Sequence, residues 1–284
     1  MNKFFYSLLF VVLAASSVFA QKSKLLFPQK PGMVSYTYRK SLQKDAAATL
    51  DTIKALGITD MEFSSLFGKT AQEMRKLLDE RGIKCSSYGV SYDDLTNKIK
   101  EVGDNAKILG ASYVRVAWIP HKGDFTLAMA QKTVEDFNQF GKTLKDNHGL
   151  TFCYHNHGYE FQPHEGGTLF DYIVQKTDPK YVSFEMDVLW TFFPGQDPAA
   201  LLNKYGNRFK LMHLKDLKKG VKGDLSGGTS PENDVPLGTG QLNIPAILIA
   251  AQKAGVQHYY IEDESSNIAT QVPQTLAYLK DLKK

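Results

Sequence analysis

A short stretch of the chain, FCYHNHGYEF at 152–161, contains three side chains that could take part in catalysis or metal binding: His155, His157 and Glu160. Imidazole and carboxylate groups transfer protons and bind divalent cations. The stretch begins like an apolar β-strand and ends too polar to continue as one. Two interpretations follow from this composition: a polar loop that is only solvated, or one wall of an active site.

Other side chains suited to binding or catalysis follow further apolar stretches, near the point where each stretch ends. They are Glu62, Trp118, Asp187, Trp190, His213, Lys215, Asp216, Glu262, Asp263 and Glu264. Buried Asp, Glu and His side chains are rare unless they are paired or bind a metal. One imidazole with two or three carboxylates suits one divalent metal ion, such as Mn2+, Zn2+, Co2+ or Mg2+, and leaves positions open for a substrate.

Each of the carboxylates and the histidine of this set also has a structural interpretation. Asp187 and His213 lie inside apolar stretches, where a satisfied structural hydrogen bond is the alternative to a metal ligand. Glu262 precedes two more acidic residues, and the alternative for one of these three is a simply solvated carboxylate. Glu160 lies beyond its strand, where a surface carboxylate is common.

Three of the basic side chains carry similar alternatives. His155 and His157 are two residues apart, with Asn156 between them, and alternate residues of a strand point to opposite faces. At least one of the histidines is therefore open to interpretation as a packing residue. Lys215 has the alternative of a salt bridge with its neighbour Asp216.

Eight stretches rich in β-branched and aromatic residues predict the strands that position these side chains. They are 33–38, 59–64, 84–90, 113–119, 151–156, 182–188, 210–216 and 258–263. Amphipathic stretches between them, four of which end in glycine, predict helices. A strand and a helix about every 30 residues predict a single α/β (β/α)8 TIM barrel, in which the C-terminal strand ends surround the active site. An open doubly wound sheet is the alternative, but the first strand lacks the Gly-rich phosphate turn typical of that fold.

The first 20 residues have the pattern of a cleaved signal peptide. Lys3 precedes the apolar run 4–15, and the small residues Val18 and Ala20 occupy the −3 and −1 positions of a cleavage site. The run is shorter than the ~20 residues that span a bilayer, although an uncleaved anchor is the alternative. We therefore expect export, to the periplasm, and a single mature domain at 21–284.

Composition excludes several other classes of protein. Hydrophobic residues make up 43% of the chain, which is ample for a packed core, and the formal charge of +4 includes no basic block of the kind that binds nucleic acid. Cys85 and Cys153 lie in apolar stretches typical of buried thiols rather than of a disulfide scaffold. After the signal no segment is long and apolar enough to cross a membrane. The oligomeric state stays open.

The motifs YHNHGYEF, EMDVLW, MHLKD, PLGTGQLN and YYIEDE, at their spacings, resemble the xylose isomerase-like TIM barrel superfamily. This sugar phosphate isomerase/epimerase group also contains inosose dehydratases, keto-sugar epimerases and endonuclease IV. The resemblance covers essentially the whole mature chain. It implies one divalent metal ion held by a glutamate after strand five, an aspartate after strand six, a histidine on strand seven and a glutamate on strand eight. Carried onto this chain, these are Glu160, Asp187, His213 and Glu262, with His157 as the alternative to Glu160.

Two departures from the family pattern bear on the substrate. Keto-sugar epimerases carry a histidine where this chain has Trp190, and an arginine where it offers Lys215 and Lys218. These differences argue against ketohexose epimerisation. They suit a different grip on the substrate, in which Trp118 and Trp190 stack against a sugar ring.

The resemblance implies an isomerase or epimerase acting on a non-phosphorylated sugar or keto-sugar through an enediolate. A metal bound to the carbonyl and the neighbouring hydroxyl acidifies the hydrogen between them. We expect Glu262 and Glu160 to be the acid/base pair. The residues expected to bind the carbohydrate are Glu62, Trp118, His155, His157, Trp190 and Lys215.

Other functions use the same pocket. Expulsion of a β-hydroxyl from the same intermediate gives a lyase or dehydratase, either inosose dehydratase-like or cleaving a keto-glycoside. A non-catalytic sugar-binding barrel is a further alternative. An endonuclease of this fold is disfavoured, because it needs a cluster of metals with more histidines than the 7 present and a basic surface for DNA.

Overall fold

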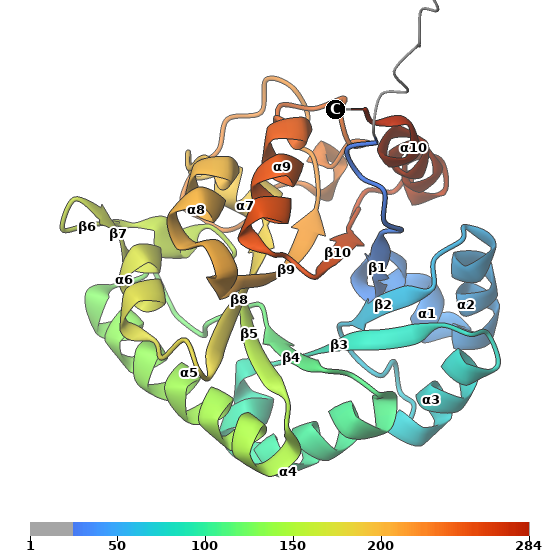
Figure 1. Cartoon of the computed structure of the whole chain (residues 1–284), viewed down its shortest axis with the longest axis horizontal. Helices are drawn as coiled ribbons and strands as arrows, with labels where there is room; N and C mark the ends of the chain where they lie inside the picture. The colour runs from blue at the N-terminus through green and yellow to red at the C-terminus, as the bar shows by residue number, and fades with distance from the viewer. Residues whose placement is uncertain (1–24, 284) are drawn as a thin grey trace, which may run out of the picture.

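The computed structural model describes residues 25–283. Eight of the strands in this range close into a parallel barrel. Around the barrel the strand order is β1-β10-β9-β8-β5-β4-β3-β2 (Figure 1). The strands are β1 (Gly32–Val34), β2 (Asp60–Phe63), β3 (Lys84–Val90), β4 (Tyr113–Val116), β5 (Thr151–His155), β8 (Val182–Asp187), β9 (Phe209–Leu214) and β10 (His258–Ile261). The predicted (β/α)8 barrel is confirmed.

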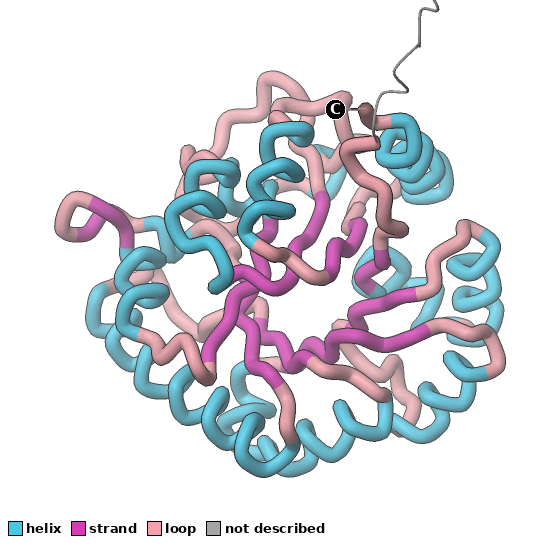
Figure 2. The backbone as a smooth tube through the Cα atoms, in the orientation of Figure 1, coloured by secondary structure: helices cyan, strands magenta, loops and turns pink. Residues whose placement is uncertain are grey.

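Helices surround the strands, as Figure 2 shows. They are α1 (Arg39–Lys44), α2 (Ala46–Ala55), α3 (Ala71–Asp79), α4 (Tyr92–Leu109), α5 (Leu127–His148), α6 (Leu169–Lys176), α7 (Val188–Phe192), α8 (Pro198–Tyr205), α9 (Ile244–Ala254) and α10 (Ile268–Asp281). Thr70 and Ser91 begin α3 and α4 with capping boxes, and Gly110 and Gly149 end α4 and α5 in the left-handed conformation. A small hairpin of β6 (Pro163–His164) and β7 (Gly167–Thr168) projects from the loop after β5.

Seven of the eight predicted strands are too long at their C-terminal ends, whereas β3 ends at Val90 as predicted. The first was expected at 33–38 but stops at Val34, and residues 35–38 form the 3-10 helix η1 (Ser35–Tyr38). Beyond the last paired residue, backbone groups find other partners: the N–H of Ser64, just after β2, donates to Ser35 Oγ at 2.7 Å. The polar residues that follow each strand thus leave the sheet and become available to a site at this end of the barrel.

The apolar core fills the space between the strands and the helices. The rings of Phe152 and Tyr154 on β5 point outward and pack on Phe137 of α5, with centroids 5.0 and 4.9 Å apart. Cys85 and Cys153 are both buried free thiols, as predicted. Within residues 25–283 we find no helix with the length and apolarity needed to cross a membrane. The predicted signal peptide, 1–20, lies outside the described residues.

Candidate metal centre

Three predicted metal ligands converge at the C-terminal ends of β8, β9 and β10. Asp187 and His213 are level in the parallel register of β8 and β9, and Glu262 follows β10 directly. His213 Nδ1 lies 2.6 Å from Glu262 Oε2 and 3.9 Å from Asp187 Oδ2. The three side chains are thus close enough to share one ion. Their convergence is the geometry that a common metal ligand set requires.

Asp187 shows the clearest need for a cation. Its Oδ1 accepts the N–H of Trp190 at 2.9 Å, which caps α7, but its buried Oδ2 has no hydrogen-bond partner in the described part of the chain. Burial raises the pKa of Asp187 to about 7, against the lowering effect of Lys215. A buried carboxylate oxygen without a partner costs free energy, and a divalent cation would supply the missing interaction. The residues present therefore fit a bound metal ion.

His213 is held from both sides by carboxylates. Its Nε2 lies 2.9 Å from Glu62 Oε1, while Nδ1 faces Glu262 and Asp187. Burial alone would lower the pKa of His213, but Glu185, Glu262 and Glu62 raise it well above its usual value. With a cation at Nδ1, the ring would be neutral and its Nε2–H would donate to a carboxylate, an arrangement common among metal-bound histidines.

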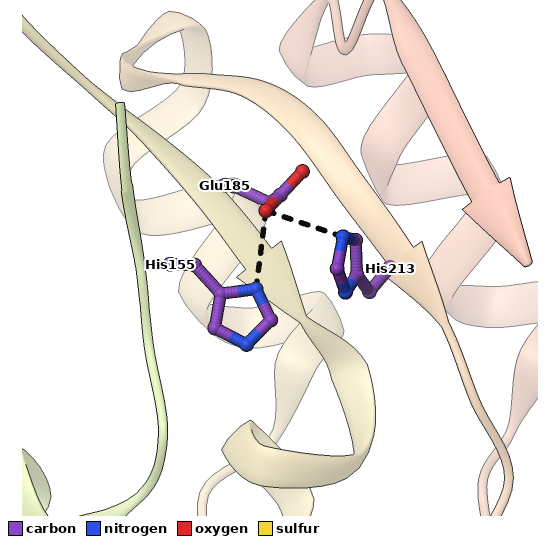
Figure 3. A group of neighbouring side chains, drawn as sticks. All are labelled: His155, Glu185 and His213. Atoms are coloured by element: carbon purple, nitrogen blue, oxygen red, sulfur yellow. Dashed lines mark hydrogen bonds and ion pairs between the residues drawn. The ribbon is translucent and has the colours of Figure 1, made fainter. Parts of the chain in front are cut away.

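A second histidine lies beside this centre and shares a carboxylate with it, as Figure 3 shows. Glu185 Oε2 is 3.1 Å from His155 Nδ1 and 3.3 Å from His213 Nε2. The other nitrogen of His155, Nε2, is 3.8 Å from Asp187 Oδ2. His155 thus directs this nitrogen from β5 toward the Asp187 carboxylate. The sequence analysis overlooked Glu185, although it lies two residues before Asp187 and so faces the same side of β8.

Arg115 was also overlooked, although it is a charged residue inside the apolar stretch YVRVAWI. Its side chain is 8% exposed and lies between two carboxylates. Arg115 Nε is 3.0 Å from Glu62 Oε1 and 3.3 Å from Glu185 Oε2. Burial would lower the pKa of Arg115, but these carboxylates raise it, so the guanidinium stays charged. The base of the site therefore contains a fixed cation.

The prediction that Glu62 contacts the substrate needs correction. The residue is fully buried, and besides Arg115 and His213 it accepts the hydroxyl of Ser87 at 2.6 Å. Burial would raise its pKa, but Arg115 and His213 lower it to about 2. Glu62 is an ionised support beneath the centre, because Arg115, His213 and Ser87 occupy its carboxylate and it does not line the cavity.

The prediction for Glu160 is also corrected, both as a metal ligand and as a catalytic acid or base. It lies in the 3-10 helix η2 (Tyr159–Phe161) and is fully buried. Its Oε1 accepts the hydroxyl of Tyr154 at 2.8 Å and the N–H of His157 at 2.9 Å. Tyr154 points outward toward α5, because it alternates with the inward-pointing His155, and Glu160 follows Tyr154 to the outside of the barrel wall.

Glu160→Gln is expected to stabilise the protein at alkaline pH. Burial raises the pKa of Glu160 to about 6 from its usual 4.5. A raised native pKa favours folding below the unfolded-state pKa, and this contribution is lost as the pH rises through the native pKa. Glutamine cannot ionise, so relative to the wild type it should gain about 2 kcal/mol between roughly pH 4 and pH 8. Urea unfolding at both pH values measures this difference. A gain that is independent of pH would contradict it.

A cavity of about 790 Å3 opens above the centre. Four of the predicted substrate-binding residues line it, together with residues that the sequence analysis did not select. The predicted four are Trp118, His155, His157 and Trp190, and the additional ones include Tyr36, Arg39, Lys40, Gln43 and Phe67. The lining of the cavity thus combines aromatic side chains with basic ones.

The aromatic wall offers stacking surfaces and a neutral imidazole. Trp118 is 43% exposed, whereas Trp190 is buried and stacks on His157 with ring centroids 5.3 Å apart. Burial lowers the pKa of His157 to about 3, and its Nδ1 has no partner among residues 25–283. Sugar rings present apolar C–H faces, so an exposed indole such as Trp118 suits them.

Lys215 is placed beside the centre but not in the cavity wall. Its ammonium is buried, 2.8 Å from Glu264 Oε1, 3.7 Å from Asp234 Oδ2 and 3.8 Å from Glu262 Oε2. Direct contact with a substrate is therefore not supported. The alternative pairing with Asp216 is wrong, since the Asp216 carboxylate accepts backbone N–H groups instead.

The long loop at 217–243 is fixed at both ends by that carboxylate. Asp216 accepts the N–H groups of Leu217, Gly238, Gly240 and Leu242 at 2.9 to 3.0 Å. Between these anchors the loop supplies Asp234 and residues 227–231 to the cavity wall. The loop is therefore part of the site, as is usual for a loop of this length inside a compact domain.

Comparison with known proteins agrees with this geometry. Residues 50–282 match the model of the xylose isomerase-like TIM barrel family. An inosose dehydratase of Clostridium beijerinckii is 25% identical over 186 residues, which cover 58% of this chain and 61% of that enzyme, so the chain matches less than two thirds of this relative.

Solved structures show the same fold. A sugar phosphate isomerase/epimerase from Parabacteroides distasonis is 24% identical with a TM-score of 0.70, over 94% of this chain and 97% of that one. The IOLI protein with a bound zinc atom is 14% identical with a TM-score of 0.67, over 89% and 96% of the two chains. With its closed barrel and a family match over most of its length, this chain belongs to the xylose isomerase-like TIM barrel family.

Proposed function

We propose that this protein is a divalent-metal-dependent lyase that removes a proton next to the carbonyl of a keto-sugar or ketocyclitol and expels the β-hydroxyl as water. The observation that carries the proposal is the buried, unpartnered Asp187 Oδ2 facing His213 and Glu262. The inosose dehydratase relatives support elimination over the other outcomes of the same chemistry.

Four atoms of this chain are suited to hold the metal: Asp187 Oδ2, His213 Nδ1, Glu262 Oε2 and His155 Nε2. Two imidazoles with two carboxylates suit Zn2+, Mn2+ or Co2+ better than Mg2+, which prefers an all-oxygen shell. The zinc atom of the IOLI protein is in keeping with this set. When bound, the metal polarises the substrate carbonyl and stabilises the charge that develops on its oxygen.

Glu262 is the proposed proton acceptor. Burial would raise its pKa, but Lys215 and His213 lower it well below the usual range, so the carboxylate is ionised at neutral pH and able to accept a proton. One of its oxygens faces His213, and the side chain also lines the cavity, where a substrate would lie. A positioned base of this kind contributes about 10²–10⁴-fold to the rate.

Other residues that line the cavity are proposed to bind the carbohydrate. His157 offers a neutral imidazole to a hydroxyl, and Trp118 offers a stacking face. The cavity lies toward the upper end of the roughly 300–1,000 Å3 of ligand sites, which leaves room for a glycosidically linked substrate. The signal-like segment 1–20 favours a protein exported to the periplasm, where it would meet free rather than phosphorylated sugars.

Isomerisation or epimerisation is the second candidate. Both begin with the same proton removal and differ only in returning the proton to carbon. Glu262 and His157 line the cavity from the segments that follow different strands, β10 and β5, an arrangement that suits proton return to either side of an enediolate.

The test is incubation of the purified protein with free sugars, keto-sugars and ketocyclitols in D2O, with Mn2+ and after chelation. We expect NMR to show metal-dependent loss of water from one class of substrate. Deuterium incorporation without loss of water would favour the isomerase, and release of an aglycone would favour a lyase acting on a keto-glycoside. Binding without any exchange or turnover would overturn the enzyme proposal in favour of a sugar-binding barrel.

A further inference from the structure

We propose that Arg115 is a positioning residue for the metal centre, whose guanidinium orients both His155 and His213 through the two carboxylates Glu62 and Glu185. This inference rests on the proposed function, because it concerns the affinity of the centre for its metal. It assigns a purpose to a buried cation that takes no part in the proposed proton transfer.

Arg115 joins carboxylates from separate parts of the barrel wall. It lies on β4, while Glu62 lies on β2 and Glu185 on β8. Its Nε and Nη2 both donate to Glu62 Oε1, at 3.0 and 2.5 Å, and Nε is also 3.3 Å from Glu185 Oε2. One planar side chain therefore holds the two carboxylates at a fixed separation.

The same carboxylate oxygens hold the histidines. Glu62 Oε1 is 2.9 Å from His213 Nε2, and Glu185 Oε2 is 3.1 Å from His155 Nδ1. Each ring then directs its other nitrogen toward Asp187 Oδ2, at 3.9 Å for His213 and 3.8 Å for His155. The chain of contacts from guanidinium to carboxylate to imidazole ends at the metal position on both branches.

Without Arg115 these contacts would not persist. Glu62 and Glu185 both approach His213 Nε2, at 2.9 and 3.3 Å, so without the guanidinium two buried carboxyl groups would compete for one imidazole nitrogen. Loss of the donors that hold them in place would let at least one turn away and release its histidine. A lysine would restore the charge but not the planar set of donors that bridges two carboxylates.

The position of Arg115 also bears on whether the side chains drawn in Figure 3 bind an ion of their own. His155, Glu185 and His213 have the residue types and spacing of a metal site of their own. However, Arg115 Nε already lies 3.3 Å from the oxygen that would bind such an ion. The guanidinium supplies the positive charge at this level of the barrel, so we expect one metal ion per chain rather than two.

Gly89 on β3 makes room for the guanidinium. It is level with Arg115 in the parallel register, and a Cβ atom at position 89 would lie 2.8 Å from Arg115 Cζ. Gly89→Ala should therefore displace the guanidinium while leaving every charge of the site in place. This substitution separates the position of Arg115 from its charge.

The experiment measures the Mn2+ dissociation constant by electron paramagnetic resonance of the free ion, and the coordination of Co2+ by its visible spectrum. For Arg115→Lys and for Gly89→Ala we expect Mn2+ affinity to fall about 10–100-fold, the usual effect of losing support for a metal ligand. We also expect an altered Co2+ spectrum in both variants.

Two matched controls separate positioning from general damage. Arg208→Lys changes a partly buried arginine that lies away from the centre, where its Nη2 donates to Thr177 Oγ1 at 2.8 Å. Gly103→Ala adds a Cβ against the His148 ring, where α4 packs on α5 outside the barrel wall. Both should lower stability and leave Mn2+ affinity and the Co2+ spectrum unchanged.

The outcomes distinguish this inference from the proposed function. Wild-type Mn2+ affinity in Gly89→Ala and Arg115→Lys would overturn the positioning role and leave the enzyme proposal standing. Failure of the wild-type protein to bind any divalent cation would overturn both. If Arg115→Lys does not fold, Gly89→Ala alone decides the question.

Discussion

Glu262→Gln should lower turnover by at least about 100-fold while the barrel stays folded. The substitution keeps the size of the side chain and an oxygen for His213, but it removes the basic carboxylate from the cavity wall. The measurement is kcat at saturating Mn2+, so that an effect on metal binding is not mistaken for loss of the base. Thermal unfolding of the same sample establishes that the fold is intact.

The adjacent Asp263 provides the control for this prediction. Its buried carboxylate accepts the N–H of Ser265 at 2.9 Å and is not part of the cavity lining. Asp263→Asn should therefore retain nearly full turnover at some expense of stability. If Glu262→Gln proved as active as Asp263→Asn, the assignment of Glu262 as the proton acceptor would be wrong.

Asp187→Asn should abolish the stabilisation of the protein by Mn2+ and weaken Mn2+ binding by more than about 100-fold, beyond the effect of losing a supporting residue. The asparagine Oδ1 can still cap α7 by accepting the N–H of Trp190. It removes the charged, unpartnered Oδ2, so we expect the metal-free variant to be at least as stable as the metal-free wild type. Thermal unfolding with and without Mn2+ measures both effects.

Glu160→Gln is the matched comparison for Asp187→Asn. It also neutralises a buried carboxylate with an unpartnered oxygen, but on the outside of the barrel wall. Its Mn2+-dependent stabilisation should equal that of the wild type. Loss of that stabilisation in Glu160→Gln, or its survival in Asp187→Asn, would contradict the ligand set.

The barrel was predictable because its strands are short apolar runs at a regular spacing. The ends of the strands were less predictable. Pairing with the neighbouring strands stops β1 at Val34 and β4 at Val116, and the sequence of a single stretch does not reveal that pairing. Asp187, His213 and Glu262 converge as expected, since each lies at the C-terminal end of a strand. That part of the site follows from the fold alone.

The supporting residues of the site depend on contacts between distant segments. Nothing local to Arg115 reveals that it bridges Glu62 and Glu185, because those partners lie 53 and 70 positions away in the chain. For Glu160 it was nearness in the sequence that made the prediction misleading. It is near His155 in sequence, but the alternation of β5 sends Tyr154, and Glu160 with it, to the other side of the wall.

The anchoring of the long loop by Asp216 has a consequence for how this architecture can diversify. Because one carboxylate fastens both ends of the segment, its middle can change length and composition without disturbing His213, three residues before the anchor. We expect grafts that replace residues 219–232 to alter which carbohydrate is accepted and to leave the reactive centre untouched. The residues that select the carbohydrate can therefore change without change in the residues that carry out the reaction.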